Sequence, residues 1–514
     1  MQQDFTLRVL PAEADDSEVI QRYISEASGR GVVSGYYPLK RSIDARGKQP
    51  LINLTVRAFI DEPYARRPGV PFHFQDVTTA SRQVVIVGAG PTGLFAALRL
   101  LELGIRPLIL ERGKDVRARR RDLALLNRSG IVDPESNYCF GEGGAGTYSD
   151  GKLYTRSHKR GDVDRILNLL VRFGAEEKIL YEAHPHIGTN KLPGIITAIR
   201  EHIESCGGRV LFGEKVTGLE RADERISAMV TAAGHRFEGD AFLLATGHSA
   251  RDIFELLMRE HIGIHFKPFA LGVRVEHPQD LIDRIQYHRL VRDLFLPPAS
   301  YSLVDHGVFS FCMCPGGIIA PAATAPGEVV VNGWSPSKRN NAFACSGIVT
   351  SIDEAQVAPF AALGPLAGVA YQQDVEQKAY NAGGGALVAP AQRMADFVSG
   401  KISQSLPGCS YLPGITSFPL VEVLPPFVHD GLQEAFTRFG KKMPGYFTNE
   451  AVVVATESRT SSPVRIPRDP VTLAHPEVPN LFPCGEGAGY AGGIVSAAMD
   501  GEKAANALKS LWFV

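Results

Sequence analysis

The first 60 residues show the hydrophobic pattern of a small unit with three strands and one helix. Apolar and polar residues alternate over 5–9, as in a strand with one buried face. Ser17 can cap a helix whose apolar residues over 19–24 share one face. Two more strand-like runs follow at 36–44 and 52–59. This order predicts a βαββ module.

The pattern changes after a proline-rich stretch at 61–81, which has the composition of a linker. Residues 84–87 are all apolar, which is typical of a parallel strand buried on both faces. Leucines then recur at helical spacing over 94–101, Gly104 can end that helix, and 105–110 is the next apolar run. A strand, a helix and a second strand in this order predict a βαβ unit.

The rest of the chain mixes both kinds of element. A helical pattern over about 160–205 precedes four strand-like runs, at 209–214, 216–221, 225–232 and 241–245. Strands, helices and loops alternate over 250–440, and the chain ends in a helical pattern. The sequence therefore predicts an α/β protein with a Rossmann-type domain, a mixed α+β domain and the N-terminal βαββ module.

Composition narrows the classes of function. The 514 residues include 54 basic and 55 acidic side chains, so the net charge of −1 indicates no nucleic-acid partner. The 7 cysteines include no C-x-x-C pair, and no metal site is predicted. There is no signal-peptide pattern and no apolar run near the ~20 residues that a membrane span needs. We therefore expect a cytoplasmic protein with no membrane partner.

A glycine fingerprint lies between the first strand of the βαβ unit and its helix. Gly88, Gly90 and Gly93 are spaced as G-x-G-x-x-G. The first glycine permits a tight turn, the second lets a pyrophosphate approach the backbone, and the third lets the helix pack close to the sheet. Pro91 and Thr92 fall in the first helical turn, where free N–H groups and the positive dipole end bind phosphates. The motif predicts a bound dinucleotide.

Glu111 ends the second strand of the unit, 23 residues after Gly88. An acidic side chain at this place can accept hydrogen bonds from both ribose hydroxyls of the adenosine half, and it would repel a 2′-phosphate. We include its neighbour Arg112 among the candidate cofactor-binding residues.

A second glycine turn, near the C-terminus, favours FAD over NAD. A short strand over 480–483 ends in a glycine and an acid, and further glycines precede the last helix. The acid can bind a ribityl hydroxyl, and the helix N-terminus can stabilise negative charge at N1 and C2=O of reduced flavin. The residues expected to face the flavin here are Gly485, Glu486, Gly492, Gly493 and Ile494.

Together these motifs resemble those of glutathione-reductase-superfamily flavoproteins, and more narrowly those of a bacterial family of uncharacterised FAD-dependent dehydrogenases. The matching segments cover nearly the whole chain, at 40–46 (KRSIDAR), 84–93, 140–153 (FGEGGAGTYSDGKL), 311–317 (FCMCPGG), 332–335 (NGWS), 457–465 (ESRTSSPVR) and 484–501. The resemblance implies FAD held without a covalent bond and leaves the substrate open.

The resemblance also implies further contacts with FAD. Related flavoproteins wrap the pyrophosphate and the flavin edge with one loop and return beside the adenine with an Ala-Thr-Gly turn. The matching residues here are Gly144, Ala145, Gly146, Thr147, Lys152, Val216, Ala245, Thr246 and Gly247. Arg119 matches an arginine that reaches the FAD in related hydroxylases, and a solvated helix face is the alternative. The superfamily usually has Asp where this chain has Glu486, whose side chain is longer and can still reach the ribityl group.

Five residues are candidates for the chemistry itself. Cys312 and Cys314 flank a methionine, and a thiol near the flavin acts as an acid, base or nucleophile if its pKa is lowered; a merely buried thiol is the alternative. Lys152 either places a cation near the flavin or lies on the surface. By resemblance, Glu457 and Arg459 approach the N5 side of the flavin, where they bind a carboxylate substrate or brace the loop.

Histidines are scattered, and none has an acid or a serine at a recognisable spacing. They are expected to be structural, and those considered are His158, His184, His186, His248 and His277.

Three functions are compatible with these motifs. The first is an FAD-dependent oxidoreductase that transfers a hydride between a small organic substrate and flavin N5. The second is an FAD-dependent monooxygenase that uses NAD(P)H and O₂, and the third is a non-catalytic FAD-binding scaffold. No second G-x-G-x-x-G begins directly at the end of a strand, as the first one does, so NAD(P)H would be a transient electron donor without a domain of its own.

The motifs also divide the chain into domains. We expect an N-terminal module at 1–80, an FAD-binding domain made of 81–250 and 441–514, and a substrate domain at 251–440. The sequence leaves the oligomeric state open.

Overall fold

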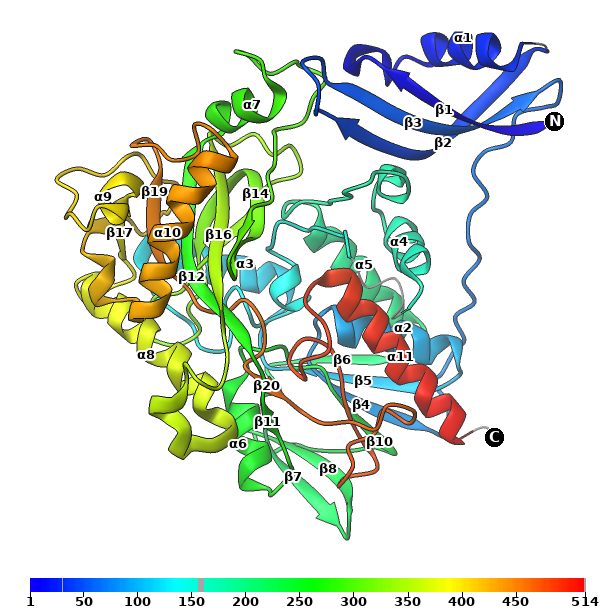
Figure 1. Ribbon diagram of the computed structural model, residues 1–514. Helices are drawn as coiled ribbons and strands as arrows, with labels where there is room; N and C mark the ends of the chain where they lie inside the picture. Colours follow the sequence, from blue (N-terminus) through cyan, green and yellow to red (C-terminus); the bar gives the residue numbers. More distant parts are fainter. Residues whose placement is uncertain (30, 156–160, 513–514) are drawn as a thin grey trace.

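The computed structural model describes residues 1–29, 31–155 and 161–512. Most helices and strands belong to an N-terminal module, a parallel nucleotide-binding sheet, or a larger mixed sheet (Figure 1). One residue considered above, His158, lies outside the described residues.

The N-terminal module has the predicted βαββ order. Its elements are β1 (Gln2–Val9), α1 (Ser17–Ser28), β2 (Val33–Asp44) and β3 (Leu51–Ile60), and the strands form an antiparallel sheet in the order β1-β3-β2. The fully buried Ile20 and Ile24 seal the helix onto the sheet. The cap of α1 is Asp16 and not Ser17, because the Asp16 carboxylate accepts hydrogen bonds from the first backbone N–H groups of the helix.

An extended linker joins the module to the rest of the chain (Figure 1). The module also touches the body directly, because the Arg41 N–H donates to the Tyr181 carbonyl at 2.7 Å and the Ala183 N–H donates to the Arg41 carbonyl at 2.9 Å. The Arg41 side chain is meanwhile paired with Asp15 of the module itself. Strand β2 therefore contributes to the contact between the module and the body, and the Arg289 guanidinium adds a hydrogen bond to the Gln49 side chain.

The nucleotide-binding sheet draws its strands from both halves of the chain. All neighbours are parallel, in the order β21-β10-β4-β5-β6. The strands are β4 (Gln83–Val87), β5 (Arg106–Glu111), β6 (Arg209–Phe212), β10 (Ala241–Leu244) and β21 (Leu481–Pro483). Because β21 pairs with β10, the last part of the chain completes a sheet begun some 400 residues earlier.

Two helices pack together on one face of this sheet, α2 (Pro91–Glu102) and α11 (Ile494–Trp512), and they cross in Figure 1. Their contact is close: a Cβ atom placed on Gly501 would lie 2.1 Å from the Thr92 carbonyl oxygen. Other elements lie around the sheet, namely α4 (Val163–Arg172), α5 (Leu192–Ser205), α6 (Arg251–Arg259), and the antiparallel β7 (Val216–Ala222), β8 (Arg225–Thr231) and β9 (Arg236–Glu238). Helix α3 (Val116–Ser129) contacts β14 of the larger sheet.

The larger sheet has eight strands, ordered β13-β14-β16-β12-β19-β17-β18 with β15 paired to β14. They are β12 (Phe269–Pro278), β13 (Val304–Asp305), β14 (Val308–Pro321), β15 (Val331–Trp334), β16 (Phe343–Ile352), β17 (Ala389–Arg393), β18 (Ile415–Ser417) and β19 (Val452–Glu457). The remaining elements are α7 (Gln279–Tyr287), α8 (Ala367–Ala382), α9 (Met394–Val398), α10 (Pro426–Lys442), and the short pair β11 (His265–Phe266) and β20 (Val464–Arg465).

Strand β19 moves one predicted domain boundary. We expected the chain to return to the FAD-binding domain at residue 441, but β19 pairs with β12 and β17 in the middle of the larger sheet. Its residues are all buried, as a central strand requires. The segment up to Glu457 therefore belongs to the larger sheet, and the chain returns to the nucleotide-binding sheet only after it.

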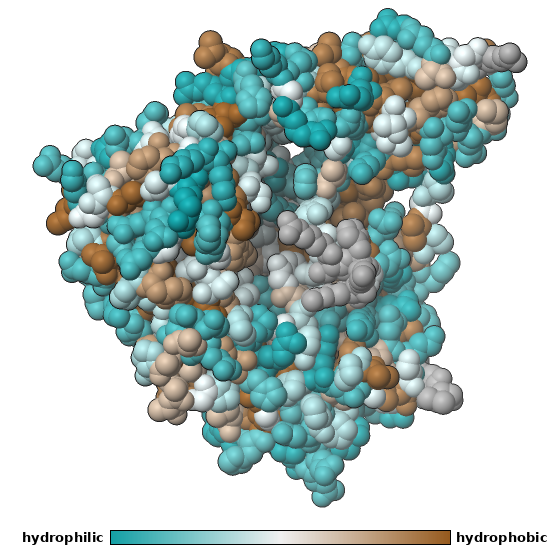
Figure 2. Space-filling model, in the orientation of Figure 1, coloured by the Kyte–Doolittle hydropathy of each residue, from teal (hydrophilic) through white to brown (hydrophobic). Residues whose placement is uncertain are grey.

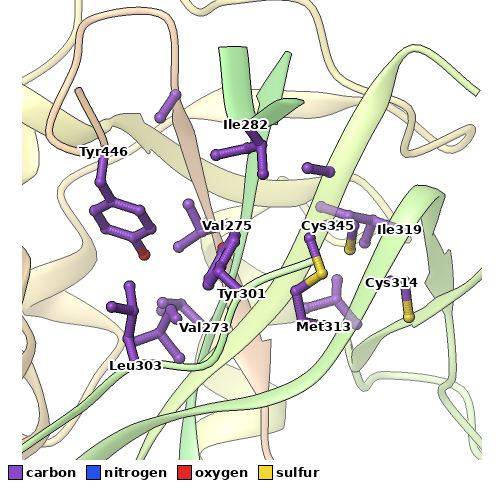
Figure 3. Packing of buried hydrophobic residues seen from close by; sticks show 14 of the residues in the cluster. Val273, Val275, Ile282, Tyr301, Leu303, Met313, Cys314, Ile319, Cys345 and Tyr446 are labelled. Atoms are coloured by element: carbon purple, nitrogen blue, oxygen red, sulfur yellow. The ribbon is translucent and has the colours of Figure 1, made fainter. Parts of the chain in front are cut away.

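The core of the larger sheet is apolar and close-packed. Figure 3 shows Val273 and Val275 of β12, Met313 of β14 and Cys345 of β16 gathered with two tyrosines, Tyr301 and Tyr446. On the outer face shown in Figure 2, hydrophobic side chains form small groups among hydrophilic ones. Among the described residues, no helix is both long and apolar enough to cross a membrane.

His277 lies near the end of β12 and is fully buried. Its Nε2 atom lies 2.8 Å from the Tyr446 carbonyl oxygen, so Nε2 carries the proton and donates it. Burial lowers the pKa of His277 from 6.5 to about 4, against the effect of this hydrogen bond. The ring is therefore neutral at pH 7, in line with a structural role.

This histidine predicts a pH-dependent loss of stability. Because the folded-state pKa is depressed, the unfolded chain takes up the proton first as the pH falls from about 6.5 to about 4, and folding free energy is lost over that window. His277→Gln keeps a donor for the carbonyl and removes the titration. Between pH 6.5 and pH 5, the urea-unfolding free energy of wild type should drop by roughly 2 kcal/mol more than that of the variant. An equal drop in both proteins would contradict the assignment.

Candidate functional site

A cavity of about 410 Å³ lies at the carboxyl ends of the parallel strands, where β4 and β5 run into the loops that follow them. This is the edge at which open α/β sheets bind ligands. Its wall combines residues from the fingerprint turn, the loop at 138–154, the loop after β10, strands β14 and β15, and the start of α11. Both sheets and both ends of the nucleotide-binding region thus contribute to one site.

The three fingerprint glycines have different roles. A Cβ atom on Gly88, whose φ is +107°, would lie 2.5 Å from the Ala245 carbonyl oxygen, and one on Gly93 would lie 2.0 Å from the Gly88 oxygen. A Cβ on Gly90 would meet only the Gly144 Cα atom, at 3.9 Å, and Gly90 lines the cavity. Gly88 and Gly93 are therefore required by packing, whereas Gly90 keeps space open for a ligand.

Two helix N-termini meet at the cavity wall. Helix α2 begins at Pro91, helix α11 begins at Ile494, and both residues line the cavity. The first N–H groups of a helix have no partner within the helix, and its N-terminal dipole end attracts negative charge. The site is thus built to receive an anionic ligand at two places.

Glu111 organises the backbone around the fingerprint. Its carboxylate accepts hydrogen bonds from Ala89 at 2.8 Å and from Gly113 and Gly141 at 2.9 Å. It also lines the cavity, so it joins the fingerprint turn, the end of β5 and the following loop around the place predicted for the adenosine ribose. Its neighbour Arg112 lines the cavity too, paired with Glu135 and Asp252.

Most of the predicted cofactor-binding residues line this one cavity. They are Gly88, Gly90, Pro91, Thr92, Glu111, Arg112, Gly144, Ala145, Gly146, Lys152, Val216, Ala245, Thr246, Gly247, Glu486, Gly492, Gly493 and Ile494. The two distant glycine turns of the sequence therefore lie in one site. The contacts of these residues with FAD itself stay predictions.

Arg119 does not line the cavity, contrary to the sequence-based hypothesis. It is fully buried, and its guanidinium donates to the backbone carbonyls of Asn137, Tyr138 and Glu142 at 2.8–3.0 Å. Because the guanidinium N–H groups of Arg119 donate to backbone carbonyls, this side chain holds the loop of the cavity wall in place. It does not bind a phosphate in the cavity.

Three further predicted residues also support the cavity from behind. Gly93 lies under the fingerprint turn, as described above. The Thr147 hydroxyl is buried and donates to the Glu142 carbonyl at 2.8 Å. Gly485 has φ of +74°, and a Cβ there would lie 2.2 Å from the Thr92 hydroxyl. Each position is set by close packing.

The proposed Arg–Glu pair of residues 457 and 459 does not form. Arg459 lines the cavity, but its guanidinium is bound to Glu376 at 2.9 and 3.0 Å and to Glu328 at 2.7 Å. Arg251 binds the same two carboxylates at 3.0 and 3.2 Å. Although burial opposes it, these two arginines lower the pKa of Glu376 to about 2. Arg459 therefore braces the loop, one of the two roles considered, and its donors are occupied.

Glu457 lies outside the cavity lining and is paired with the buried Arg274, whose Nη2 donates to Oε1 of Glu457 at 2.7 Å. The Arg274 guanidinium also donates to the Cys312 carbonyl and to the Asn332 side chain, both at 3.0 Å. Cys314 is likewise fully buried, whereas Cys312 and Lys152 line the cavity. Of the five catalytic candidates, Cys312, Lys152 and Arg459 thus reach the cavity.

Several cavity residues escaped the sequence-based reasoning. His248 was expected to be structural, yet it lines the cavity with its Nδ1 atom 3.4 Å from Glu486. Its partner is 238 residues away, so no spacing rule could pair them. Tyr138, Cys139 and Trp334 also line the cavity. The first two lie directly before the matched 140–153 segment, and Trp334 lies inside the matched 332–335 segment, so the resemblance was the signal that could have drawn attention to all three.

Comparison with known families now identifies the class. Residues 81–240 match the family "FAD binding domain", and residues 268–460 match "FAD-dependent protein, C-terminal domain-like". The protein is therefore an FAD-dependent oxidoreductase with a Rossmann-type FAD-binding domain. Residues 1–59 match a domain of unknown function, DUF8436.

The chain belongs to the same family as an uncharacterised protein of Clostridium beijerinckii (strain ATCC 51743 / NCIMB 8052). The two are 37% identical over 517 residues, which covers 96% of each chain.

Solved structures of flavoenzymes resemble the chain more distantly. The flavin-dependent brominase Bmp2 is 13% identical with a TM-score of 0.37, covering 84% of this chain and 79% of that one. CtdE in complex with FAD is 12% identical with a TM-score of 0.33, covering 83% and 84%. Glycine oxidase from Bacillus cereus ATCC 14579 is 12% identical with a TM-score of 0.32, covering 84% and 96%. At this distance the likeness says nothing about the reaction.

The residues of the cavity fit FAD. The space beside Gly90, which any side chain would fill, lies next to the N-terminus of α2, as a pyrophosphate requires. The N-terminus of α11 lies on the same cavity and can face the flavin end. The volume of about 410 Å³ is in the range of cofactor sites.

The fingerprint yields a direct test of cofactor placement. Gly90→Val should fold, because a Cβ there has room, but its methyl groups should exclude the pyrophosphate and most of the flavin absorbance should disappear. Gly93→Ala is the matched control: its Cβ meets the Gly88 carbonyl, so it should lose stability first. A folded Gly90→Val protein with full flavin content would place the pyrophosphate elsewhere.

The buried charge network yields a second test. Arg459→Met leaves Glu376 and Glu328 with Arg251 alone, and such a loss of a buried partner costs roughly 3–5 kcal/mol of unfolding free energy. Urea unfolding of the purified protein measures it. Lys378→Met, which removes an exposed pair with Asp374 on α8, should cost less than about 1 kcal/mol. If Arg459→Met kept wild-type stability, Arg459 would not be a brace.

Proposed function

We propose that the protein is a dehydrogenase or reductase that transfers a hydride between a small organic substrate and FAD at N5. The observation that carries the proposal is the composition of the cavity wall. Its nucleotide end is formed by the fingerprint turn, while β14 and β15 of the larger sheet contribute Phe311, Cys312 and Trp334. The larger sheet therefore borders the proposed cofactor site, as a substrate domain would.

FAD, when bound, supplies the two-electron redox chemistry. The chain's own residues supply position and electrostatics. The N-terminus of α11 stabilises negative charge at the edge it faces. The Lys152 ammonium adds a positive charge on the wall, and the rings of Tyr138 and Trp334 limit the access of water. The two glycine turns, at 84–93 and near 490, support the further proposal that the chain belongs among the glutathione-reductase-like flavoproteins and their dehydrogenases.

A monooxygenase is the second candidate, and one observation favours it. Among the described residues, a single five-stranded parallel sheet carries a dinucleotide fingerprint, at Gly88–Gly93. NAD(P)H would therefore have to dock transiently at the same cavity, which suits an enzyme that is reduced once and then reacts with O₂.

Reduction and reoxidation of the purified holoprotein distinguish these functions. We expect that flavin photoreduced without oxygen is reoxidised rapidly by an organic acceptor, such as a quinone or an enone, and that a matching donor bleaches it again. The Gly90→Val protein, which should lack FAD, should show neither reoxidation nor bleaching under the same conditions. Substrate-stimulated NAD(P)H oxidation that places one atom of ¹⁸O₂ in the product would instead establish the monooxygenase. A flavin that no donor or acceptor turns over would favour a scaffold.

A further inference from the structure

Strand β14 is irregular where it reaches the cavity. Its register against β16 shifts between Phe311 and Cys314, and Cys312 has φ of +45°, in the left-handed region that non-glycine residues rarely adopt. The bulge gives the two cysteines different surroundings. Cys314 is fully buried and is one of the cluster residues drawn in Figure 3, whereas Cys312 is partly exposed and lines the cavity.

Lys152 caps this bulge. Its Nζ atom lies 3.9 Å from the sulfur of Cys312 and 3.9 Å from that of Cys314, and it donates to the Met313 carbonyl. Asp150 lies 3.5 Å from the same ammonium and is itself held by Ser335 and Arg339. The cation is therefore fixed over the two sulfurs by several contacts.

The charges around Cys312 come from two sides. Lys152 lies on the cavity side, with Asp150 beside it, and the buried Arg274 lies behind, with its charge offset by Glu457. The adjacent Cys314 thiol and the charges of Lys152 and Arg274 hold the pKa of Cys312 well below its usual range, against burial and Asp150. In turn, Cys312 and Asp150 raise the pKa of Lys152 although desolvation lowers it. The geometry thus matches a thiolate beside an ammonium.

We propose that Cys312 is a thiolate nucleophile on the cavity wall, with Lys152 as its counter-ion, and that it forms a covalent thioether with small α,β-unsaturated carbonyl compounds. The Cys312 sulfur bonds to the β carbon of the acceptor. The carbon–carbon π pair moves toward the carbonyl oxygen, and the resulting enolate takes one proton from water at the α carbon. No oxidant or reductant is needed, so this reactivity goes beyond the hydride transfer proposed above and does not depend on it.

The rest of the wall suits a flat, conjugated carbonyl compound. Phe311 and Trp334 lie on the same wall and offer aromatic surface. The Asn332 side chain also lines the cavity, and because its oxygen accepts from Arg274 and from the Gly333 N–H at 2.7 Å, its NH₂ group is what it can offer to a carbonyl oxygen. The same cavity contains an internal comparison, Cys139, whose sulfur lies near the Ser249 hydroxyl and the Ala322 carbonyl. The guanidiniums that interact with it, those of Arg119 and Arg459, are engaged by backbone carbonyls and by carboxylates.

The proposal is tested with N-ethylmaleimide, which is itself such a carbonyl compound, on the holoprotein at pH 6. An ordinary thiol of pKa ~8.5 is only about 0.3% thiolate there. We expect Cys312 to be alkylated at least ten times faster than Cys139, as measured by peptide mass spectrometry. Lys152→Met should slow Cys312 at least tenfold, and Lys152→Arg should restore most of the rate. Flavin absorbance recorded in parallel shows whether each variant still holds FAD.

A second measurement is independent of reagent access. Thiolates absorb in the far ultraviolet, so the difference spectrum between wild type and Cys312→Ser, titrated with acid, reports the charge on Cys312 directly. The proposal expects this thiolate signal to persist at pH 6 and to be reduced in Lys152→Met. A difference signal that vanishes near the pKa of an ordinary thiol, or equal alkylation of Cys312 and Cys139, would overturn it. If the wild-type holoprotein showed no hydride transfer with any donor or acceptor while Cys312 still reacted, only the proposed function would be refuted.

Discussion

The close contact between α2 and α11 is the constraint on which the site depends. Gly501 approaches the Thr92 carbonyl so closely that any side chain would push the helices apart, and Gly485 is packed against the Thr92 side chain in the same way. The buried Asp500 carboxylate accepts from the Gly485 N–H at 2.7 Å and binds Arg468. Because of this packing, the N-termini of two helices from opposite ends of the chain reach one cavity, where their dipoles act together.

Two buried charge groups hold the larger sheet against that cavity. Arg274 with Glu457, and Arg459 with Glu376 and Glu328, are almost completely buried. The attraction within each group offsets the large cost of removing its charges from water, so the net contribution to the free energy of unfolding is small. Their effect is on position. They fix the loop after β19 and the bulge of β14, so that the wall facing the nucleotide half is rigid, and they leave few cationic donors unpaired on it.

Local sequence patterns predicted the parts of this structure that depend on interactions between residues close together in the sequence. The βαββ module, the fingerprint turn and the strand ending at Glu111 follow from periodicity and from glycine positions, and the second turn near Gly492 follows from the same reasoning. The partners of long charged side chains could not be predicted in this way. Arg119 and Arg459 bind groups that come close only when the chain has folded. The sequence of β19 is that of a buried strand, and it does not show to which sheet the strand belongs.

The cavity therefore has two halves that are built by different means. Around Gly88 and Gly90 the wall is mostly backbone and small side chains, so its shape follows from turns and helix ends and tolerates little change. Around Lys152, Cys312 and Trp334 the wall is made of side chains on two strands and a loop, whose identity can change without moving the backbone. The two kinds of wall can thus change independently of each other, which is how one fold can serve different reactions.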